Sequence, residues 1–404
     1  MSIEIHNDFP KVVPRQAPSR LAPSLRLVKA TELRGYLDRW SALAASAIAP
    51  NVFYEPWMLL PAVEHVRERE DLHFLLIFGP GDAGVEPLWG FFPLELQSRC
   101  LHLPIRTLAL WQHRYCYLTL PLIHREHVDA VLDGFWRWME KNPLGCRIFD
   151  TNYLPGDGAF HTAWADFLIG RYLLVLNEHP RGLQNNAGGF DAYVSGLLSR
   201  KRHHALNRSR SHLEGLGELQ YQEVTDPESA GRWVDQFLQL EAKGWKGAND
   251  GDAIAKRACD AEYFRTMTAA GLRQNRVSLL SLLLDGRPIA MKHTLRAGSG
   301  AFIFKIAYDE AFAKYSPGVL LELDHLRRWQ EGTDLQWMDT CASPRHPLFN
   351  LISNECRIIR RCLISNGSKR GDFLVSALPL LRWVRHRFHS KATPAYLRVS
   401  TKNE

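Results

Sequence analysis

Long apolar runs, paired cysteines and the common nucleotide-binding signatures are missing from this 404-residue chain. No stretch approaches the roughly 20 apolar residues that a membrane-spanning helix needs. The seven cysteines lie far apart without a C-x-x-C pair, which argues against a disulfide framework or a structural zinc and predicts a cytoplasmic location. No GKS/GKT or HExxH motif occurs, and the string GPGDAG at residues 79–84 lies in an expected turn between two strands rather than before a helix. The histidines show no metal spacing, so we expect no metal.

What the chain does contain is an ordinary globular composition with an excess of basic residues. It is 46% hydrophobic and 23% charged, and its length suits two or three domains. The net charge of +7 and the pI near 9.0 fit an anionic partner: a phosphorylated cofactor, a lipid surface or nucleic acid. Residues 1–25 are rich in Pro and Arg and lack the apolar segment of a secretory signal, so we expect a flexible leader there.

An internal repeat is the most informative global feature. Residues 132–155 (LDGFWRWMEKNPLGCRIFDTNYLP) and 323–344 (LDHLRRWQEGTDLQWMDTCASP) both read Leu-Asp, three residues, Arg-Trp and then Glu. Each segment continues through a loop into an apolar strand that ends Asp-Thr-x-x-x-Pro, at Asp150 and at Asp339. The match in order and spacing indicates a duplicated unit. Independent convergence on a helix–loop–strand pattern is the alternative.

Hairpin signals upstream of both copies support the duplication. Residues 72–97 and 277–297 each read strand, Gly-containing turn and strand. The sequence therefore predicts an α+β fold with two tandem units, each a mixed, mostly antiparallel sheet flanked by helices. We expect the first unit at 26–175 and the second at 190–390, with a linker over residues 178–190 because of its Gly, Asn and Pro content.

A Tyr-Ser-Pro-Gly stretch joins an aromatic strand to an amphipathic helix in the second unit. Ser316 suits the N-cap position, Pro317 the first helical position, and Gly318 close approach of a ligand to the backbone. The first N–H groups of such a helix, with the positive end of its dipole, form an anion site. The equivalent joint of the first unit, residues 115–131, has Pro121 but no glycine, so we expect that unit to be degenerate. A simple helix start, without a ligand, is the alternative.

The segments FKIAYDEAFAKYSPGVLLELDHL and WMDTCASPRHPLF give the chain a family resemblance. They resemble the GNAT-type acetyltransferases of the cellulose-biosynthesis (CelD-like) group, which are similar to the FemAB aminoacyltransferases with two GNAT-like units. The resemblance covers residues 190–365 well and the first half loosely. It implies acetyl-CoA or another acyl-CoA as co-substrate, with its pyrophosphate on the strand-to-helix loop and its pantetheine between two splayed strands. The residues that it assigns to cofactor binding are Tyr315, Ser316, Pro317, Gly318, Val319 and Leu320.

Acyl transfer to an amine needs a base, a group that stabilises the oxyanion, and an acid for the leaving thiolate. Asp309 is a candidate base, or alternatively a turn carboxylate. Strand alternation places Lys305 on the same face of the strand as Asp309. There Lys305 could neutralise an anion, or alternatively form an ion pair at the sheet edge. Tyr308 and Tyr315 are candidate acids or channel-lining residues. Cys341 has no His-Asp frame, so we do not expect a nucleophile there. The predicted catalytic residues are Lys305, Tyr308, Asp309, Asp339 and His346.

Basic and aromatic residues elsewhere suggest contacts with the acceptor and with anions. Trp245 and Lys246 are predicted to form a lip on the acceptor side, and the basic helix at 200–210 could contact an anionic acceptor or a CoA phosphate. The C-terminal run 377–388 mixes apolar residues with Arg382, Arg385 and Arg387, which suits peripheral contact with an anionic membrane or a packed helix.

These features predict an acyl-CoA-dependent N-acyltransferase. Its expected acceptor is a small molecule or glycan precursor, such as an amino sugar of envelope or polysaccharide biosynthesis. An aminoacyl-tRNA-dependent transferase is the first alternative, and a non-enzymatic anion-binding scaffold the second. No sequence-specific nucleic-acid partner is expected, and the sequence leaves the acyl donor, the acceptor, the general base and the oligomeric state open.

Overall fold

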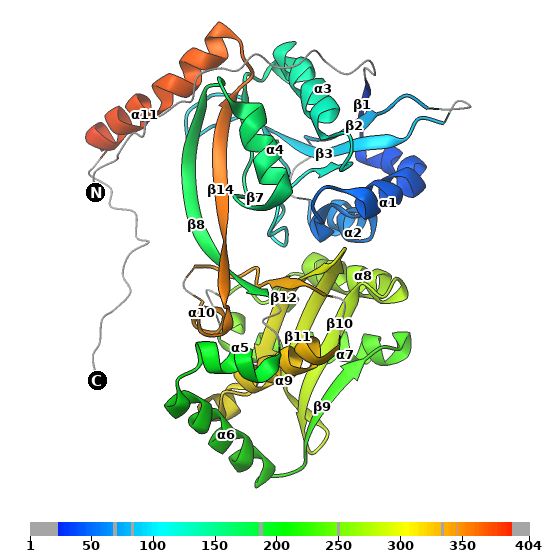
Figure 1. The fold of residues 1–404 in the computed structure, drawn as a ribbon, viewed down its shortest axis with the longest axis vertical. Coiled ribbons are helices and arrows are strands. Elements are labelled where there is room, and N and C mark those ends of the chain that lie inside the picture. The colour runs from blue at the N-terminus through cyan, green and yellow to red at the C-terminus, as the bar shows by residue number, and fades with distance from the viewer. Residues whose placement is uncertain are drawn as a thin grey trace.

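The computed structural model describes residues 23–389, except for 68–70, 82–84, 186–188, 249–250, 333–334 and 345. The chain folds as α+β, with one continuous mixed sheet flanked by helices (Figure 1), which confirms the predicted fold class. Most neighbouring strands are antiparallel, and the pairs β4–β6 and β12–β13 are parallel. Every residue of the apolar strand β2 (Leu72–Phe78) is buried, as is typical of a strand covered on both faces.

The sheet follows the order β1-β2-β3-β4-β6-β14-β8-β13-β12-β11-β10-β9, with β5 beside β3 and β7 beside β14. The further first-half strands are β1 (Ser24–Val28), β3 (Leu88–Gln97), β4 (Thr107–Leu110), β5 (Leu122–Ile123), β6 (Ile148–Asp150), β7 (Leu154–Pro155) and β8 (Leu173–Asn185). The second-half strands are β9 (Leu219–Val224), β10 (Val277–Leu284), β11 (Arg287–Ala297), β12 (Gly300–Tyr308), β13 (Trp337–Asp339) and β14 (Glu355–Ser365).

Helices cover the faces of this sheet. The first-half α-helices are α1 (Leu37–Ser46), α2 (Pro56–His65), α3 (Val128–Glu140) and α4 (Gly158–Leu168). The second-half α-helices are α5 (Phe190–Leu197), α6 (Arg200–Glu214), α7 (Pro227–Lys243), α8 (Ala258–Arg273), α9 (Pro317–Gly332), α10 (Pro347–Ile352) and α11 (Lys369–His389). Short 3₁₀ turns include η1 (Ala30–Tyr36), η2 (Val52–Tyr54), η3 (Pro143–Gly145), η4 (Trp245–Gly247), η5 (Ile254–Lys256) and η6 (Glu310–Tyr315).

The two halves exchange their last long strands. β14, from the end of the chain, lies between β6 and β8, while the end of β8 pairs with β13 of the second half. Figure 1 shows β8 and β14 side by side, running from one half into the other. Each half of the sheet contains a strand from the other half of the chain, so strand pairing alone sets no boundary between two units. The predicted division at 26–175 and 190–390 stays a prediction.

The repeated Asp-Thr pairs fasten these exchanged strands in equivalent ways. Thr151 bonds to the backbone of Cys362 in β14, and Thr340 bonds to the backbone of Gly182 in β8. The preceding aspartates bind the arginines before those partners. Asp150 is paired with Arg361 at 2.6 Å, and Asp339 is paired with Arg181 at 2.8 Å. The conserved order of these contacts supports the duplication inferred from the repeat.

The predicted linker at 178–190 is wrong over residues 178–185, which belong to β8. Its turn-forming residues serve packing instead. A Cβ on Gly182 would lie 2.4 Å from the Ser353 hydroxyl oxygen, so glycine is needed there because another chain segment approaches closely.

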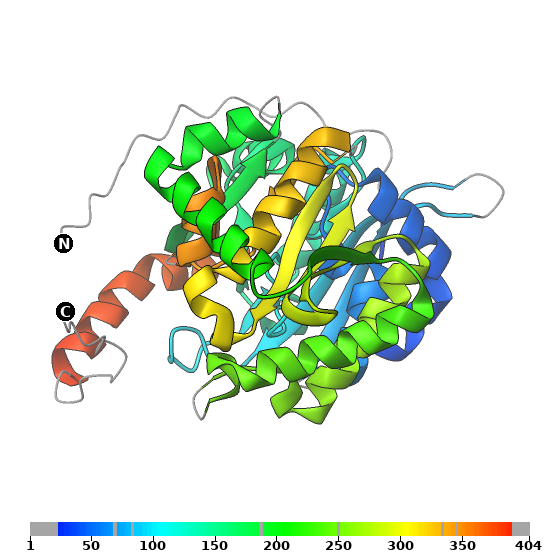
Figure 2. The same cartoon turned by 90° about the horizontal axis from the view of Figure 1, so that it is seen from below.

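Two apolar clusters lie on opposite faces of the second-half sheet. Phe302, Phe304 and Ala307 of β12 pack with α7 and α8, in a core continuous with the first half. Ala301 and Ile303 of the same strand pack beneath α9. Figure 2 shows α9 in gold against one face of the yellow strands. β12 therefore contributes side chains to the apolar clusters on both faces of the sheet.

Buried neutral histidines predict that the fold is sensitive to acid. Burial lowers the pKa of both His113 and His293 to about 3. Because the folded pKa is depressed, their contribution is present above the unfolded value near 6.5 and is lost as pH falls from there toward 3. We expect each histidine to lower the free energy of unfolding by about 2 kcal/mol at pH 5, relative to pH 7 and above. Urea unfolding at both pH values tests this; His293→Met should reduce the loss, and exposed His203→Ala should not.

Within the described ranges, no helix combines the length and apolar character needed to cross a bilayer. The outer side of α11 carries exposed apolar residues, with Phe373 70% and Leu380 62% exposed. The predicted membrane contact depends on Arg382, Arg385 and Arg387. The structure does not describe the side chains of these residues. That contact stays a prediction.

Candidate functional site

A fork opens between the parallel strands β12 and β13. They pair only over Gly300–Phe302, and β12 then runs on to Tyr308 paired with β11 but not with β13. The Asp309 N–H donates to the Ile289 carbonyl of β11 at 2.9 Å. Because hydrogen-bonded pairs alternate along an antiparallel ladder, the backbone groups of Ile306 and Tyr308 point away from β11, toward the open side of the fork. This edge can bond to an extended ligand.

The equivalent fork of the first half is filled by the chain itself. The Asn152 side chain donates to the Leu110 carbonyl at 2.7 Å, which bridges the fork. Thr119 exchanges hydrogen bonds with the segment 151–153, and Asn51 donates to the carbonyls of Leu118 and Leu120. The residue equivalent to Asn152 in the second repeat is Cys341, which cannot make the same amide bridge. That the first unit is degenerate stays a prediction, with which this contrast is consistent.

The start of α9 differs in detail from the sequence expectation. Pro317 is the first helical residue, as predicted, but Ser316 has a left-handed backbone (φ 53°) and ends η6. The N–H groups of Val319 and Leu320 donate to the Ser316 carbonyl at 2.9 and 3.1 Å, so they are not free as predicted. Of the predicted donors, the Gly318 N–H has no such bond among the described residues.

Gly318 also has a packing role. An added Cβ would lie 3.6 Å from the Tyr308 ring and 3.7 Å from Ile306, which is ordinary contact. There is room for one methyl group but a larger side chain would press against the strand. Tyr308 therefore lies beneath the start of α9, beside the open strand edge.

The basic helix α6 lies close to this helix start. The His212 and Tyr315 rings are stacked with centroids 6.1 Å apart, and Arg210 bonds to Asp324 of α9 at 2.6 Å. The Lys314 ammonium lies 4.8 Å from the Tyr315 ring centroid. Positive charge is thus gathered next to the α9 N-terminus, where the helix dipole also favours an anion.

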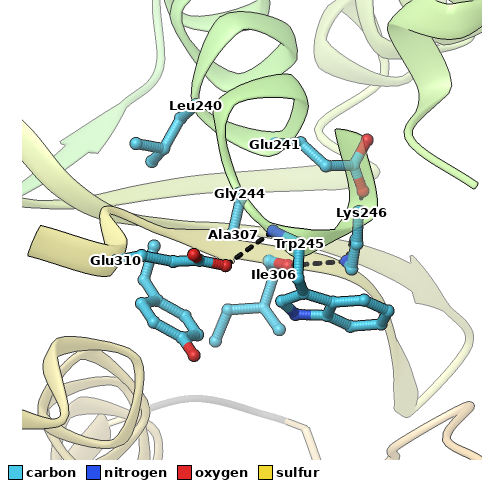
Figure 3. A pocket seen from close by; sticks show the side chains of 9 residues that line it. Leu240, Glu241, Gly244, Trp245, Lys246, Ile306, Ala307 and Glu310 are labelled. Carbon is cyan, nitrogen blue, oxygen red and sulfur yellow. Dashed lines mark hydrogen bonds and ion pairs between the residues drawn. The ribbon is translucent and has the colours of Figure 1, made fainter. Parts of the chain in front are cut away.

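Trp245 and Lys246 lie over the open edge of β12, as Figure 3 shows. The Lys246 ammonium donates to the Ile306 carbonyl at 3.1 Å and pairs with Glu241 at 3.2 Å. The Trp245 N–H donates to Glu310 at 2.6 Å, while its side chain is 61% exposed. These residues line a pocket with Ile306, Ala307 and Tyr308. Burial lowers the pKa of Lys246.

Lys305 reaches toward the first half of the chain. Its ammonium lies 5.3 Å from the Tyr115 ring centroid and is hydrogen-bonded to the Tyr117 phenol. Burial alone would lower the pKa of Lys305, but Tyr117, Glu241 and Asp252 together raise it, so the side chain stays cationic. The sequence interpretation missed both tyrosines. Their Tyr-Cys-Tyr spacing was the available signal, but nothing local places it opposite β12.

The structure does not bring Asp309 and Lys305 together as predicted. Asp309 accepts from the Ala311 N–H at 3.0 Å as a cap and forms an ion pair with Arg287. The strand ends between the two residues, so the alternation that would place them on one face does not continue. Asp309 therefore occupies the capping role that was the alternative reading.

Asp339 is fully buried, and its carboxylate accepts from Arg181 at 2.8 Å and from Arg357 at 3.0 Å. Burial alone would raise its pKa, but these guanidinium groups lower it. Burial raises the pKa of the Cys341 thiol well above its ordinary value, so it stays protonated. Asp339 is held in a structural pair, and Cys341 is no thiolate nucleophile.

His346 lies at the N-cap position of α10, with its ring 4.8 Å from the Phe349 centroid. Its buried Nδ1 has no hydrogen-bond partner among the described residues. Burial, and then the nearby Lys246 cation, lower its pKa, which leaves a neutral imidazole near pH 7. A neutral ring with an unpaired nitrogen is suited to accepting a proton.

Comparison with known families matches part of the chain. Residues 200–344 match the family described as "Acetyltransferase (GNAT) domain". This segment is similar to that family. It contains the fork, the start of α9 and the pocket at Trp245, while the first half lies outside the match. No curated protein matches the chain.

Solved structures share the wider architecture at low sequence identity. FemX is similar with a TM-score of 0.53 and 8% identity, covering 84% of this chain and 96% of that chain. A C-terminal domain of a putative lysylphosphatidylglycerol synthetase from Agrobacterium fabrum has a TM-score of 0.48 and 14% identity, covering 87% and 96%. The likeness to FemX shows a shared fold across both halves.

Proposed function

We propose that this chain is an acyl-CoA-dependent N-acyltransferase of the GNAT type. The observation that carries the proposal is the open edge of β12 beneath the start of α9, in a segment that matches the acetyltransferase domain. The first half has the same strand order, but its fork is closed by Asn152 and the segment 117–120. The donor therefore binds in the second half only.

The residues around the fork fit an acyl-CoA co-substrate. The Ile306 N–H and the backbone of Tyr308 offer hydrogen bonds to the amide groups of pantetheine, while the Ile306 carbonyl already accepts from Lys246. The Gly318 N–H, Lys314 and the basic residues of α6 offer positive charge for its phosphates. When bound, acyl-CoA supplies a thioester carbonyl that is activated toward attack by an amine.

The protein's own residues then act on the acceptor amine and its proton. His346 Nδ1 takes the proton from the amine as the new bond to nitrogen forms. The Lys305 cation, held by Tyr117, stabilises negative charge that develops at the acyl oxygen. Tyr308 remains a candidate proton donor to the leaving sulfur. Trp245 and Lys246 border the acceptor side.

The acceptor that we propose is an amine on a small molecule or glycan precursor, such as an amino sugar. This choice, and the narrower placement in the cellulose-biosynthesis group, rest on the resemblance over residues 190–365. The acetyl group is proposed as the acyl chain on the same ground. A cytoplasmic location stays a prediction.

Aminoacyl-tRNA is the second candidate donor, because the exposed basic face of α6 lies beside the start of α9. A thermal-shift panel with CoA, acetyl-CoA, longer acyl-CoAs and charged tRNA separates the donors. We expect CoA and acetyl-CoA to raise the melting temperature and tRNA to leave it unchanged. Stabilisation by tRNA alone would favour the second candidate. If Lys305→Ala leaves function intact and no thioester is consumed, the scaffold alternative holds.

A further inference from the structure

The turn before α3 gathers side chains that suit a transition metal. One ligand atom each from His124, Glu126 and His127 lies within 4.8 Å of the others, a grouping that stands alone among the described residues. Two imidazole nitrogens and one carboxylate oxygen form a donor set that zinc prefers when a fourth position is left to water. The His-x-Glu-His spacing matches none of the motifs sought in the sequence, which is why it was passed over.

Neighbouring residues hold both rings in place. The His127 ring is stacked on Trp89 with centroids 3.8 Å apart, and the two histidine rings lie 4.8 Å apart. The His124 N–H donates to the Trp89 carbonyl at 2.8 Å, so β3 fixes the turn from below. Such support around a set of ligands reduces the ordering that metal binding requires.

The direction of the nearest guanidinium also permits a cation. The arginine within the turn, Arg125, is directed to the end of α1, where it donates to the carbonyls of Ser46 and Ala45 at 3.2 and 3.3 Å. The Glu126 N–H contact to His124 Nδ1 is long, at 3.3 Å, and is readily given up.

We propose that His124, Glu126 and His127 bind a divalent transition metal of the zinc class at the start of α3. Ligand atoms that each lie roughly 2.0–2.1 Å from a zinc ion are closer to one another than 4.8 Å. The three side chains therefore move toward one another on binding, and the exposed Glu126 side chain moves most. The metal links the turn to the N-cap of α3 in the first half, away from the acyl-transfer fork. This proposal is independent of the acyltransferase assignment.

The test uses the full chain, freed of any affinity tag and of metal by chelation, then titrated with Zn²⁺ by calorimetry and with Co²⁺ by absorption. We expect one equivalent of each and a visible Co²⁺ band of low-symmetry coordination. His124→Ala/His127→Ala should lower Zn²⁺ affinity on the order of 100-fold or more, and Glu126→Gln by about 10-fold. The matched control, His203→Ala/His204→Ala on exposed α6, should leave affinity unchanged.

Melting curves keep the test interpretable if the double variant folds poorly. Zn²⁺ should raise the melting temperature of the wild-type and control proteins and leave that of the His124/His127 variant unchanged. Glu126 is exposed, so Glu126→Gln should fold normally and still bind less tightly. Absence of stoichiometric binding, unchanged affinity in the ligand variants, or an equal loss in the control would overturn the proposal.

Discussion

Replacing Asp339 with alanine is expected to lower the free energy of unfolding by about 3–5 kcal/mol, because it strands a buried arginine. The Arg181 side chain is only 2% exposed and loses its carboxylate partner. Arg357 also loses Asp339 but keeps an ion pair with Asp157 at 3.2 Å. Urea unfolding of the wild-type and variant proteins measures the difference.

The repeat provides a matched control at Asp150. Its partner Arg361 is 40% exposed, so water can solvate the guanidinium when the carboxylate is removed. We therefore expect Asp150→Ala to cost clearly less, about 1–2 kcal/mol. Equal losses at both positions, or a loss below about 1 kcal/mol at Asp339, would contradict a structural role set by burial.

Replacing His346 with alanine is expected to lower kcat by about 10²–10⁴-fold, the range typical of losing a general base. CoA affinity should change little, because His346 is assigned to the amine proton rather than to the donor. Steady-state kinetics with acetyl-CoA and an amine acceptor, together with calorimetric CoA binding, measure the two effects separately.

The pH profile distinguishes this role from a purely structural one. A base must be neutral, and the pKa of His346 is lowered from its ordinary value. The wild-type rate should therefore be flat near pH 7 and decline only below about 6.5, with one proton taken up. This decline in rate at acidic pH should be absent from the His346→Ala variant. A parallel loss of kcat and CoA binding, or the same acidic decline in the variant, would count against the assignment.

Local patterns sufficed for much of the fold. The Asp-Thr repeat, the Gly-containing hairpin turns and the Pro317 helix start correctly indicated a duplicated, mostly antiparallel sheet with helices. The exchange of β8 and β14 could not be predicted, because a strand's partners depend on long-range pairing. Gly182 suggested a linker because its role, the close approach of Ser353, is likewise a long-range contact.

The candidate site was predictable only in part. Trp245, Lys246 and the start of α9 all lie near the end of β12, but the roles predicted for them stay predictions. Tyr117 was missed because it comes from the other half of the chain, across a contact that spacing does not encode. Asp309 was misplaced because strand alternation was extended past the end of β12, where the residue becomes a cap.

Amide hydrogen exchange with and without CoA tests the central claim most directly. The account predicts that CoA slows exchange at residues 304–308 of the β12 edge and at 316–320 around the start of α9. Exchange in the first half, at 117–131, should remain the same. Protection at 117–131, or no change at either place with saturating CoA, would contradict a donor site built on the second half alone.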